Sequence, residues 1–108
     1  MPFKLLAYDR LRKGGEVAAE LPATLARHRR WIAIYPVLGD DRQHFKAFQV
    51  LDFELDEDDL SDFFSTDLRK NQQRLNMPTE AELYAYLEVK GIEPSVFDAP
   101  WHCDFPAE

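Results

Sequence analysis

The chain has 108 residues and a formal net charge of −7, from 13 Lys and Arg residues against 20 Asp and Glu residues. Its content of 45% apolar and 31% charged residues is typical of an ordered globular protein, and its length predicts a single domain over residues 1–108. The acidic balance argues against a general nucleic-acid-binding protein, which needs a surplus of Lys and Arg to displace phosphate counterions.

The sequence also predicts a cytoplasmic location. No run approaches the roughly 18 consecutive apolar residues of a membrane span. Asp9 interrupts the first apolar patch too early for a signal peptide. Cys103 is the only cysteine, so an intrachain disulfide is excluded, as is usual in a reducing compartment.

The chain begins with two short apolar-rich segments, Phe3–Arg10 and Glu16–Leu21. Gly14 and Gly15 separate them, and glycine reaches positive φ without steric cost. This pattern predicts a β-hairpin, although the Ala and Glu residues of these segments also favour helix. The next residues, Ala23–Arg30, could form a short helix or a basic loop.

The middle of the chain predicts two buried strands. Trp31–Tyr35 is β-branched and aromatic, and Gly39–Asp41 then predicts a turn. His44–Leu55 is the clearest strand. One face of it is apolar at period two, with Phe45, Ala47, Leu51, Phe53 and Leu55. The other face is apolar in the middle and charged at its ends, which predicts a central antiparallel strand that is partly covered on both sides.

Helices are expected in the second half. Asp56 is a candidate N-cap, and the residues after it have helical apolar spacing, namely Leu60, Phe63, Phe64 and Leu68. Arg69–Asn76 would then extend this helix or form a loop.

A second helix begins more clearly at Thr79, because Glu82 completes a capping box. Its predicted buried stripe is Leu83, Tyr86 and Leu87. Gly91 is expected to end this helix. In the tail that follows, we expect three aromatic side chains to cover an edge of the core, those of Phe97, Trp101 and Phe105.

The order of these segments predicts the fold class. It is α+β, with a small antiparallel sheet from the N-terminal half packed against two or three helices from the C-terminal half.

No catalytic or cofactor-binding motif is present. His102 precedes Cys103, but adjacent residues of an extended chain point in opposite directions and rarely form a base and its nucleophile. Three scattered histidines and one cysteine lack the close spacing of a zinc site. We therefore expect no enzyme activity, no cofactor and no metal.

The strongest local anomaly is a run of acids without any Lys or Arg: Asp52, Glu54, Asp56, Glu57, Asp58, Asp59, Asp62 and Asp67. It contributes to a charge asymmetry, +4 for residues 1–50 and −11 for residues 51–108. The run lacks the glycine turn and the ligand spacing of an EF-hand loop. Helix capping and a solvated face explain part of it. An electronegative docking surface for a basic partner would explain the whole run.

Two other features have a structural and a functional interpretation. The basic stretch Arg27–Arg30 is too short to be a nucleic-acid footprint, so a solvated loop or helix end is favoured. Trp101 and Phe105 either cap the core or serve as anchors at an interface, where Trp is enriched.

With these features, the chain resembles the bacterial immunity proteins of contact-dependent growth inhibition and other polymorphic toxin systems. The segments that carry the resemblance are Leu5–Asp9 with Gly14–Gly15, then Phe53–Leu60, and the ending Trp101–Pro106. The resemblance implies an acidic cytoplasmic protein without catalysis that binds and neutralises a cognate toxin, in many cases a nuclease with a basic cleft.

The leading hypothesis is accordingly an inhibitor of a basic toxin domain, with no direct contact to nucleic acid or membrane. Its expected partner-binding residues are Asp52, Glu54, Glu57, Asp58, Asp59, Asp62, Asp67 and Trp101. Two alternatives stay open: an acidic nucleic-acid mimic that blocks a DNA-binding protein, and a small enzyme that uses His102 and Cys103 or a pair of carboxylates.

Overall fold

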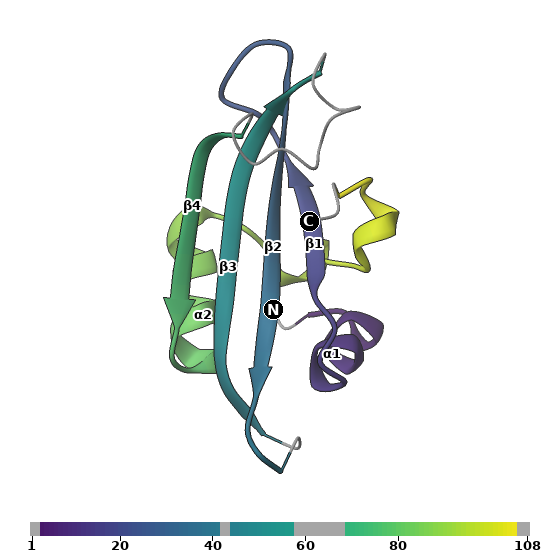
Figure 1. Cartoon of the computed structure of the whole chain (residues 1–108), viewed down its shortest axis with the longest axis vertical. Coiled ribbons are helices and arrows are strands. Elements are labelled where there is room, and N and C mark those ends of the chain that lie inside the picture. Colours follow the sequence, from purple (N-terminus) through teal and green to yellow (C-terminus); the bar gives the residue numbers. More distant parts are fainter. Residues whose placement is uncertain (1–2, 42–43, 58–68, 106–108) are drawn as a thin grey trace.

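Four antiparallel strands form one sheet in the order β1-β2-β3-β4 (Figure 1). The computed structural model describes residues 3–41, 44–57 and 69–105. The strands are β1 (Val17–Leu21), β2 (His28–Leu38), β3 (Phe45–Asp56) and β4 (Lys70–Met77). The helices are α1 (Leu5–Arg12), α2 (Glu80–Lys90) and the short 3-10 helices η3 (Pro94–Val96) and η4 (Pro100–His102). The α+β class with an antiparallel sheet is therefore confirmed, but one of the two α-helices comes from the N-terminal half.

The two central strands, β2 and β3, carry apolar residues on both faces, as their sequences predict. Toward the helices, the buried residues Ile32, Ile34, Phe48 and Val50 join the main core with residues of α1 and α2. Toward the opposite side, Trp31, Leu51, Phe53 and Leu55 form a second cluster. The predicted central strand is confirmed, because β3 pairs with β2 on one side and β4 on the other.

Phe45 is an exception to the predicted facing of β3. A register irregularity follows Val37, where Leu38 pairs with Phe45. The Phe45 ring packs on Phe48 at 4.7 Å between centroids, in the main core, and not with Leu51 and Phe53. The strict alternation assumed from the sequence is interrupted at this end of the strand.

The predicted N-terminal hairpin is wrong, because its first segment is helix α1. Phe3, Ala7 and Leu11 are buried and recur every four residues, the spacing of one helix face. Gly14, with φ of 90°, follows the helix, and its N–H donates to the carbonyl of Leu11 at 3.0 Å. The glycines thus end a helix and lead into β1.

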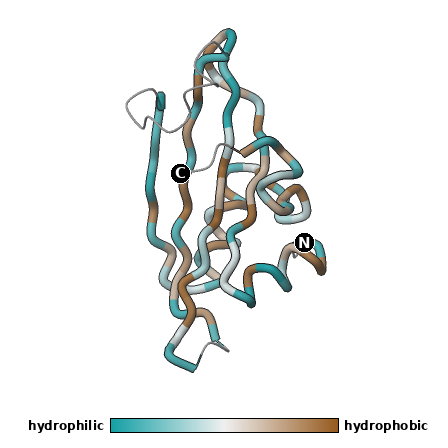
Figure 2. The backbone as a smooth tube through the Cα atoms, turned by 45° about the vertical axis from the view of Figure 1, so that its right-hand side comes forward, coloured by the Kyte–Doolittle hydropathy of each residue, from teal (hydrophilic) through white to brown (hydrophobic). Residues whose placement is uncertain are grey.

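The segment Arg69–Asn76, predicted to extend a helix or form a loop, lies largely in strand β4. Leu75 pairs with Val50, and Met77 with Phe48, so these two apolar residues reach the core. The rest of β4 is polar and appears as a hydrophilic edge beside β3 (Figure 2).

The acidic segment after β3 is only partly described. Asp56, predicted as a helix N-cap, is the last residue of β3. The N–H of Glu57 donates to the carbonyl of Arg27 at 2.8 Å. The helix predicted beyond them falls on residues 58–68, which lie outside the described residues.

The predicted second helix is confirmed as α2. The hydroxyl of Thr79 accepts a hydrogen bond from the N–H of Glu82 at 3.1 Å, so Thr79 is the N-cap. Gly91 has φ of 71° and follows the last turn. The N–H of Ile92 then donates to the carbonyl of Leu87 at 2.9 Å. Within the predicted stripe, Leu83 and Leu87 are fully buried and Tyr86 is half-buried.

The C-terminal tail passes around the β1 edge of the sheet. The backbones of Ala18 and Asp98 exchange hydrogen bonds of 2.9 and 3.0 Å at this edge. Phe97 lies in the main core, whereas Phe105 packs on Phe53 in the second cluster. Trp101, in contrast, is 66% exposed, so it does not cover the core as predicted. Among the described residues, no helix has the length and apolar character to cross a membrane.

Candidate protein-binding surface

Glu54 was expected on an exposed acidic face, but its side chain is buried. Its carboxylate accepts hydrogen bonds from the N–H groups of Thr24 and Leu25 at 2.9 and 3.2 Å. It also accepts from the hydroxyl of Thr24 and from the side-chain amide of Asn71. Burial alone would raise the pKa of Glu54, but these hydrogen bonds outweigh it and hold the pKa at about 2. Glu54 therefore connects β3 to the β1–β2 connection on one side and to β4 on the other.

Asp52 is also directed inward and is paired. Its two carboxylate oxygens accept from Nε and Nη2 of Arg30 at 3.0 and 2.7 Å. Hydrogen bonding to Asp52, set against the desolvation that lowers it, raises the pKa of Arg30. Asp52 and Glu54 lie two residues apart on the strand face that carries Val50, so neither of them belongs to an exposed acidic face.

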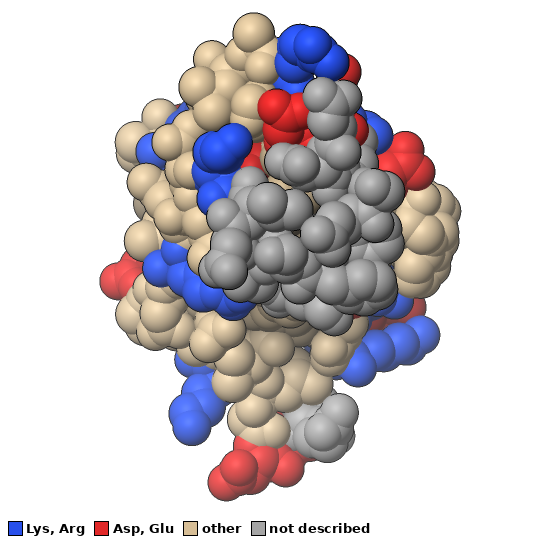
Figure 3. Space-filling view, turned by 45° about the horizontal axis from the view of Figure 1, so that its top comes forward, with Lys and Arg blue, Asp and Glu red and all other residues tan. Residues whose placement is uncertain are grey.

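None of the other acids predicted to bind a partner is buried among the described residues. Glu57 is exposed at the end of β3. Four acids of the run, Asp58, Asp59, Asp62 and Asp67, lie outside the described residues. Around this end of the sheet, acidic and basic side chains of the described residues are intermingled (Figure 3). The part of the chain that the structure describes therefore shows no continuous acidic field there.

The stretch Arg27–Arg30 is neither helix nor simple loop, because it enters β2 at His28. Arg29 donates to both carboxylate oxygens of Glu20, at 2.8 and 2.6 Å, and lies 3.6 Å from Asp104. Its guanidinium also covers the ring of Trp31 at 4.8 Å. Basic residues of the first half thus neutralise acids from several parts of the chain.

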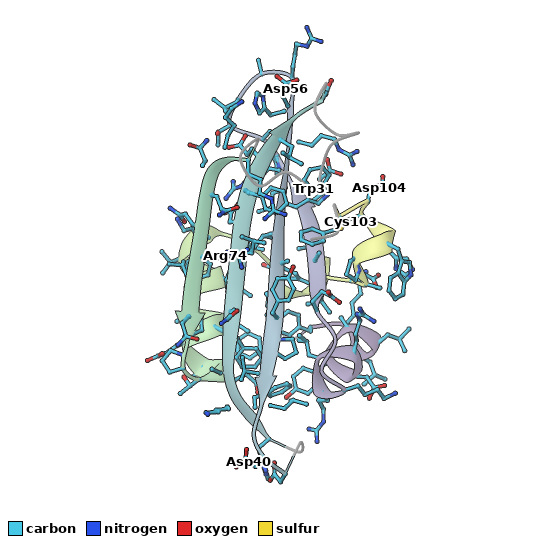
Figure 4. The ribbon with its side chains drawn as sticks, viewed as in Figure 1. Trp31, Asp40, Asp56, Arg74, Cys103 and Asp104 are labelled. Atoms are coloured by element: carbon cyan, nitrogen blue, oxygen red, sulfur yellow. The ribbon has the colours of Figure 1, made fainter. Side chains whose placement is uncertain are left out.

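Cys103 lacks the surroundings of an activated thiol. Burial raises its pKa, and Sγ donates to the carbonyl of Pro100 at 3.5 Å. Nδ1 of His102 instead pairs with Asp98 at 3.0 Å. Cys103 and Asp104 follow η4 on the side of the sheet that carries Trp31, whose indole N–H donates to the carbonyl of Cys103 at 2.8 Å (Figure 4). This arrangement holds the tail in place, and it offers no base beside a nucleophile.

No metal centre is found within the described residues, since no three His, Cys, Asp or Glu side chains there come together as ligands. A hollow of about 190 Å³ lies on the sheet near Tyr35, Leu51 and Arg74. None of the strongly exposed large hydrophobic residues lines it.

Trp101, the remaining predicted residue, forms the wall of a larger groove. This Trp101 groove has a volume of about 400 Å³ and lies between α1 with its following turn and η4. The residues that line it include Leu6, Asp9, Arg10, Lys13, Gly15, Asp98, Trp101 and His102. Leu6 is 80% exposed, and its neighbour Leu5 is 83% exposed. Large apolar side chains at a concave surface are characteristic of interaction sites.

Arg10 holds the indole of Trp101 from one side. The guanidinium carbon lies 4.8 Å from the centre of the Trp101 ring. Nε and Nη2 donate to the carbonyl and carboxylate of Glu16, each at 2.6 Å, which fixes the plane of the guanidinium. Arg10 also packs closely against Gly15, where an added Cβ would lie 2.9 Å from Cγ of Arg10. Gly15 is therefore needed for Arg10 to occupy this position.

The sequence did not indicate the partners of Trp101. Leu6, Arg10 and Gly15 lie about ninety residues earlier, in a segment predicted to be a hairpin. Helical spacing would have placed Leu6, Asp9 and Lys13 on one face, away from the buried Ala7 and Leu11. That signal was present in the sequence, but only the fold brings it beside the tail.

No family model, curated protein or solved structure matches the chain.

Proposed function

We propose that this chain is a cytoplasmic immunity protein that inhibits a cognate toxin by docking to it, without catalysis of its own. The observation that carries the proposal is the exposed Trp101, fixed on Arg10 and lining one groove with the exposed Leu6. Trp and Arg are the residue types most enriched at the energetic centres of protein interfaces.

The rigidity of this site supports binding. A side chain that is already fixed loses little conformational freedom when a partner covers it. Arg10 makes two hydrogen bonds to Glu16 and packs on Gly15, so the indole it supports is oriented before a partner arrives. In this proposal Trp101 is a central anchor of the interface.

The acids retain a secondary role in the proposal. Glu57, with Asp58, Asp59, Asp62 and Asp67, would attract a basic toxin domain such as a nuclease and speed the encounter. Asp52 and Glu54 have no part in docking, because their carboxylates are occupied within the fold.

Co-expression with a candidate toxin tests this proposal. An immunity gene directly follows its toxin gene, so the toxic C-terminal domain of the preceding gene product is expressed in bacteria with or without this chain. We expect growth arrest without the chain and growth with it. Trp101→Ala should abolish protection, whereas Val89→Ala, which shortens an apolar side chain 85% exposed on α2, should not.

Three outcomes would contradict the proposal. They are the lack of a toxin gene at that position, continued growth arrest with the wild-type chain, and full protection by Trp101→Ala. Circular dichroism of both variants establishes that they are folded, so lost protection can be assigned to the surface.

A further inference from the structure

The charged side chains that line the Trp101 groove are already paired within the chain. Lys13 lies 3.0 Å from Asp9, and Nη2 of Arg10 lies 2.6 Å from Glu16. Asp98 is 3.3 Å from Lys4 and 3.0 Å from His102. Because each of these charges already has an opposite charge beside it, the groove offers little net attraction to a charged group of a partner.

The apolar surfaces of the groove have no such internal partners to lose. Trp101 is 66% exposed although Arg10 covers part of its ring, and Leu6 is 80% exposed. About 400 Å³ of space lies between the walls that they help to form. This volume is within the range of sites that enclose small apolar ligands.

We infer that the Trp101 groove receives an uncharged apolar side chain, such as Leu, Phe or Trp, from a loop or helix of the partner protein. This inference rests on the proposed function and specifies the partner at the same surface. It separates two contributions to docking. Glu57 and the acids that follow it in the sequence govern the rate of encounter, and the groove governs how long the complex persists.

An unbiased peptide selection tests this chemistry without knowledge of the partner. A phage-displayed library of random peptides is panned on the purified wild-type chain, with Trp101→Ala used to remove peptides that bind elsewhere. We expect the remaining peptides to share Leu, Phe or Trp at one position. Enrichment of Lys and Arg, enrichment of Asp and Glu, or no enrichment would each overturn the inference.

Isothermal titration of the selected peptides then examines the role of charge. Raising the salt concentration from 50 to 500 mM screens exposed charges but leaves apolar burial intact. We expect the dissociation constant to change less than twofold, and a tenfold weakening would contradict the inference.

Matched variants locate the binding to this groove. Leu6→Asp should weaken peptide binding at least tenfold, whereas Val89→Asp on α2 should leave it unchanged. The double variant Asp9→Lys with Lys13→Asp exchanges two paired charges without removing them. It should bind within twofold of wild type, and a larger loss would mean that these charges recognise the ligand.

The two proposals fail in different ways. Selection of apolar peptides together with no protection against the toxin would refute the immunity function and retain the groove chemistry. Protection that depends on Trp101, together with selection of basic peptides, would refute the apolar ligand and retain the immunity function.

Discussion

The carboxylate of Glu54 accepts two hydrogen bonds from Thr24, one from the backbone N–H at 2.9 Å and one from the hydroxyl at 2.5 Å. Thirty residues separate the two in sequence, so this contact closes the β1–β2 connection onto β3. A third strand joins through Asn71, whose side-chain amide donates to the same carboxylate at 3.0 Å. A single buried charge thus links three parts of the sheet.

Glu54→Gln should destabilise the protein by about 2 kcal/mol, since hydrogen bonds to a charged group are stronger than those to an amide. The NH2 group of the new glutamine would also face the N–H groups that now donate to the carboxylate, and it cannot accept hydrogen bonds from them. Urea unfolding followed by circular dichroism measures the change. Glu57→Gln is the matched control on the exposed side, and its free energy of unfolding should stay within about 0.5 kcal/mol of wild type. Equal effects of the two substitutions would contradict the assigned role.

Stability should fall in acid. Burial opposes ionisation of Glu54, but its hydrogen bonds lower its pKa to about 2, and a hydrogen bond from Arg29 lowers that of Glu20. A carboxyl whose pKa is lower in the folded than in the unfolded chain stabilises the fold above the unfolded pKa. That stability is lost as pH falls through the folded pKa. We expect the free energy of unfolding to level off above about pH 5 and to decline toward pH 2.

Glu54→Gln should make this acid decline smaller. The variant starts from a lower stability at neutral pH and has one fewer group to protonate. Urea midpoints measured at intervals from pH 2 to pH 7 provide the comparison. Parallel curves for the wild-type protein and the variant would show that Glu54 does not contribute to the pH dependence.

Removal of one partner of the Arg30–Asp52 pair should be costly. Asp52→Ala leaves the guanidinium of Arg30 in a largely buried position without its carboxylate, at an expected cost of about 2–3 kcal/mol. The double variant Arg30→Met with Asp52→Leu removes both charges and should lie within about 1 kcal/mol of wild type. Denaturant unfolding of all three proteins tests this. A double variant as unstable as the single one would argue that the pair itself stabilises the fold.

Tyr86→Phe should stabilise the protein by about 1 kcal/mol. The Tyr86 hydroxyl is buried and, among the described residues, has no hydrogen-bond partner. Burial raises its pKa, with a further contribution from the charge of Asp52. Thermal unfolding measures the effect, and Tyr84→Phe, which changes a hydroxyl associated with Glu80, is the comparison. A loss of stability in Tyr86→Phe would indicate that the hydroxyl has a partner in solution.

The two tryptophans should differ sharply in fluorescence. Trp31 is fully buried and Trp101 is 66% exposed, so acrylamide should quench only part of the emission. Trp101→Phe should remove the accessible, red-shifted part. Its stability should change by less than about 1 kcal/mol, because the ring contributes mainly its contact with Arg10. Uniform quenching of the wild-type protein would contradict the exposed position of Trp101.

The sequence was informative wherever its signals were local. The capping residues of α2, Thr79 and Gly91, act through neighbours three to five residues away, and both were predicted. The central strand β3 was also predictable, because a strand buried on both faces has apolar residues on both. Strand β4 was missed because it is an edge strand. Only Leu75 and Met77 of this strand reach the core, and its other residues are polar, so the segment shows no alternation of apolar and polar residues.

The sequence-based predictions for α1 and for the acidic surface were wrong for other reasons. Leu5 and Leu6 are apolar although they are exposed, so the apolar residues of this segment do not show the helical spacing of the buried Ala7 and Leu11. Gly14 and Gly15 then suggested a hairpin. Asp52 and Glu54 belong to the acidic run in the linear sequence, and the charge of a run does not indicate which face of a strand its side chains occupy. In a strand, side chains two positions apart share a face, and here that face is the buried one. Their partners, Arg30 and Thr24, were identifiable only after β2 and β3 were in register.

The Trp101 groove also determines when a newly made chain can bind. Its α1 wall is synthesised before all four strands, and its η4 wall is synthesised after them. All four strands are synthesised before Asp98, so a nascent chain can complete the sheet while the groove still lacks one wall. Polypeptides that stop before residue 98 therefore retain the sequence of the sheet but have no anchor for a partner.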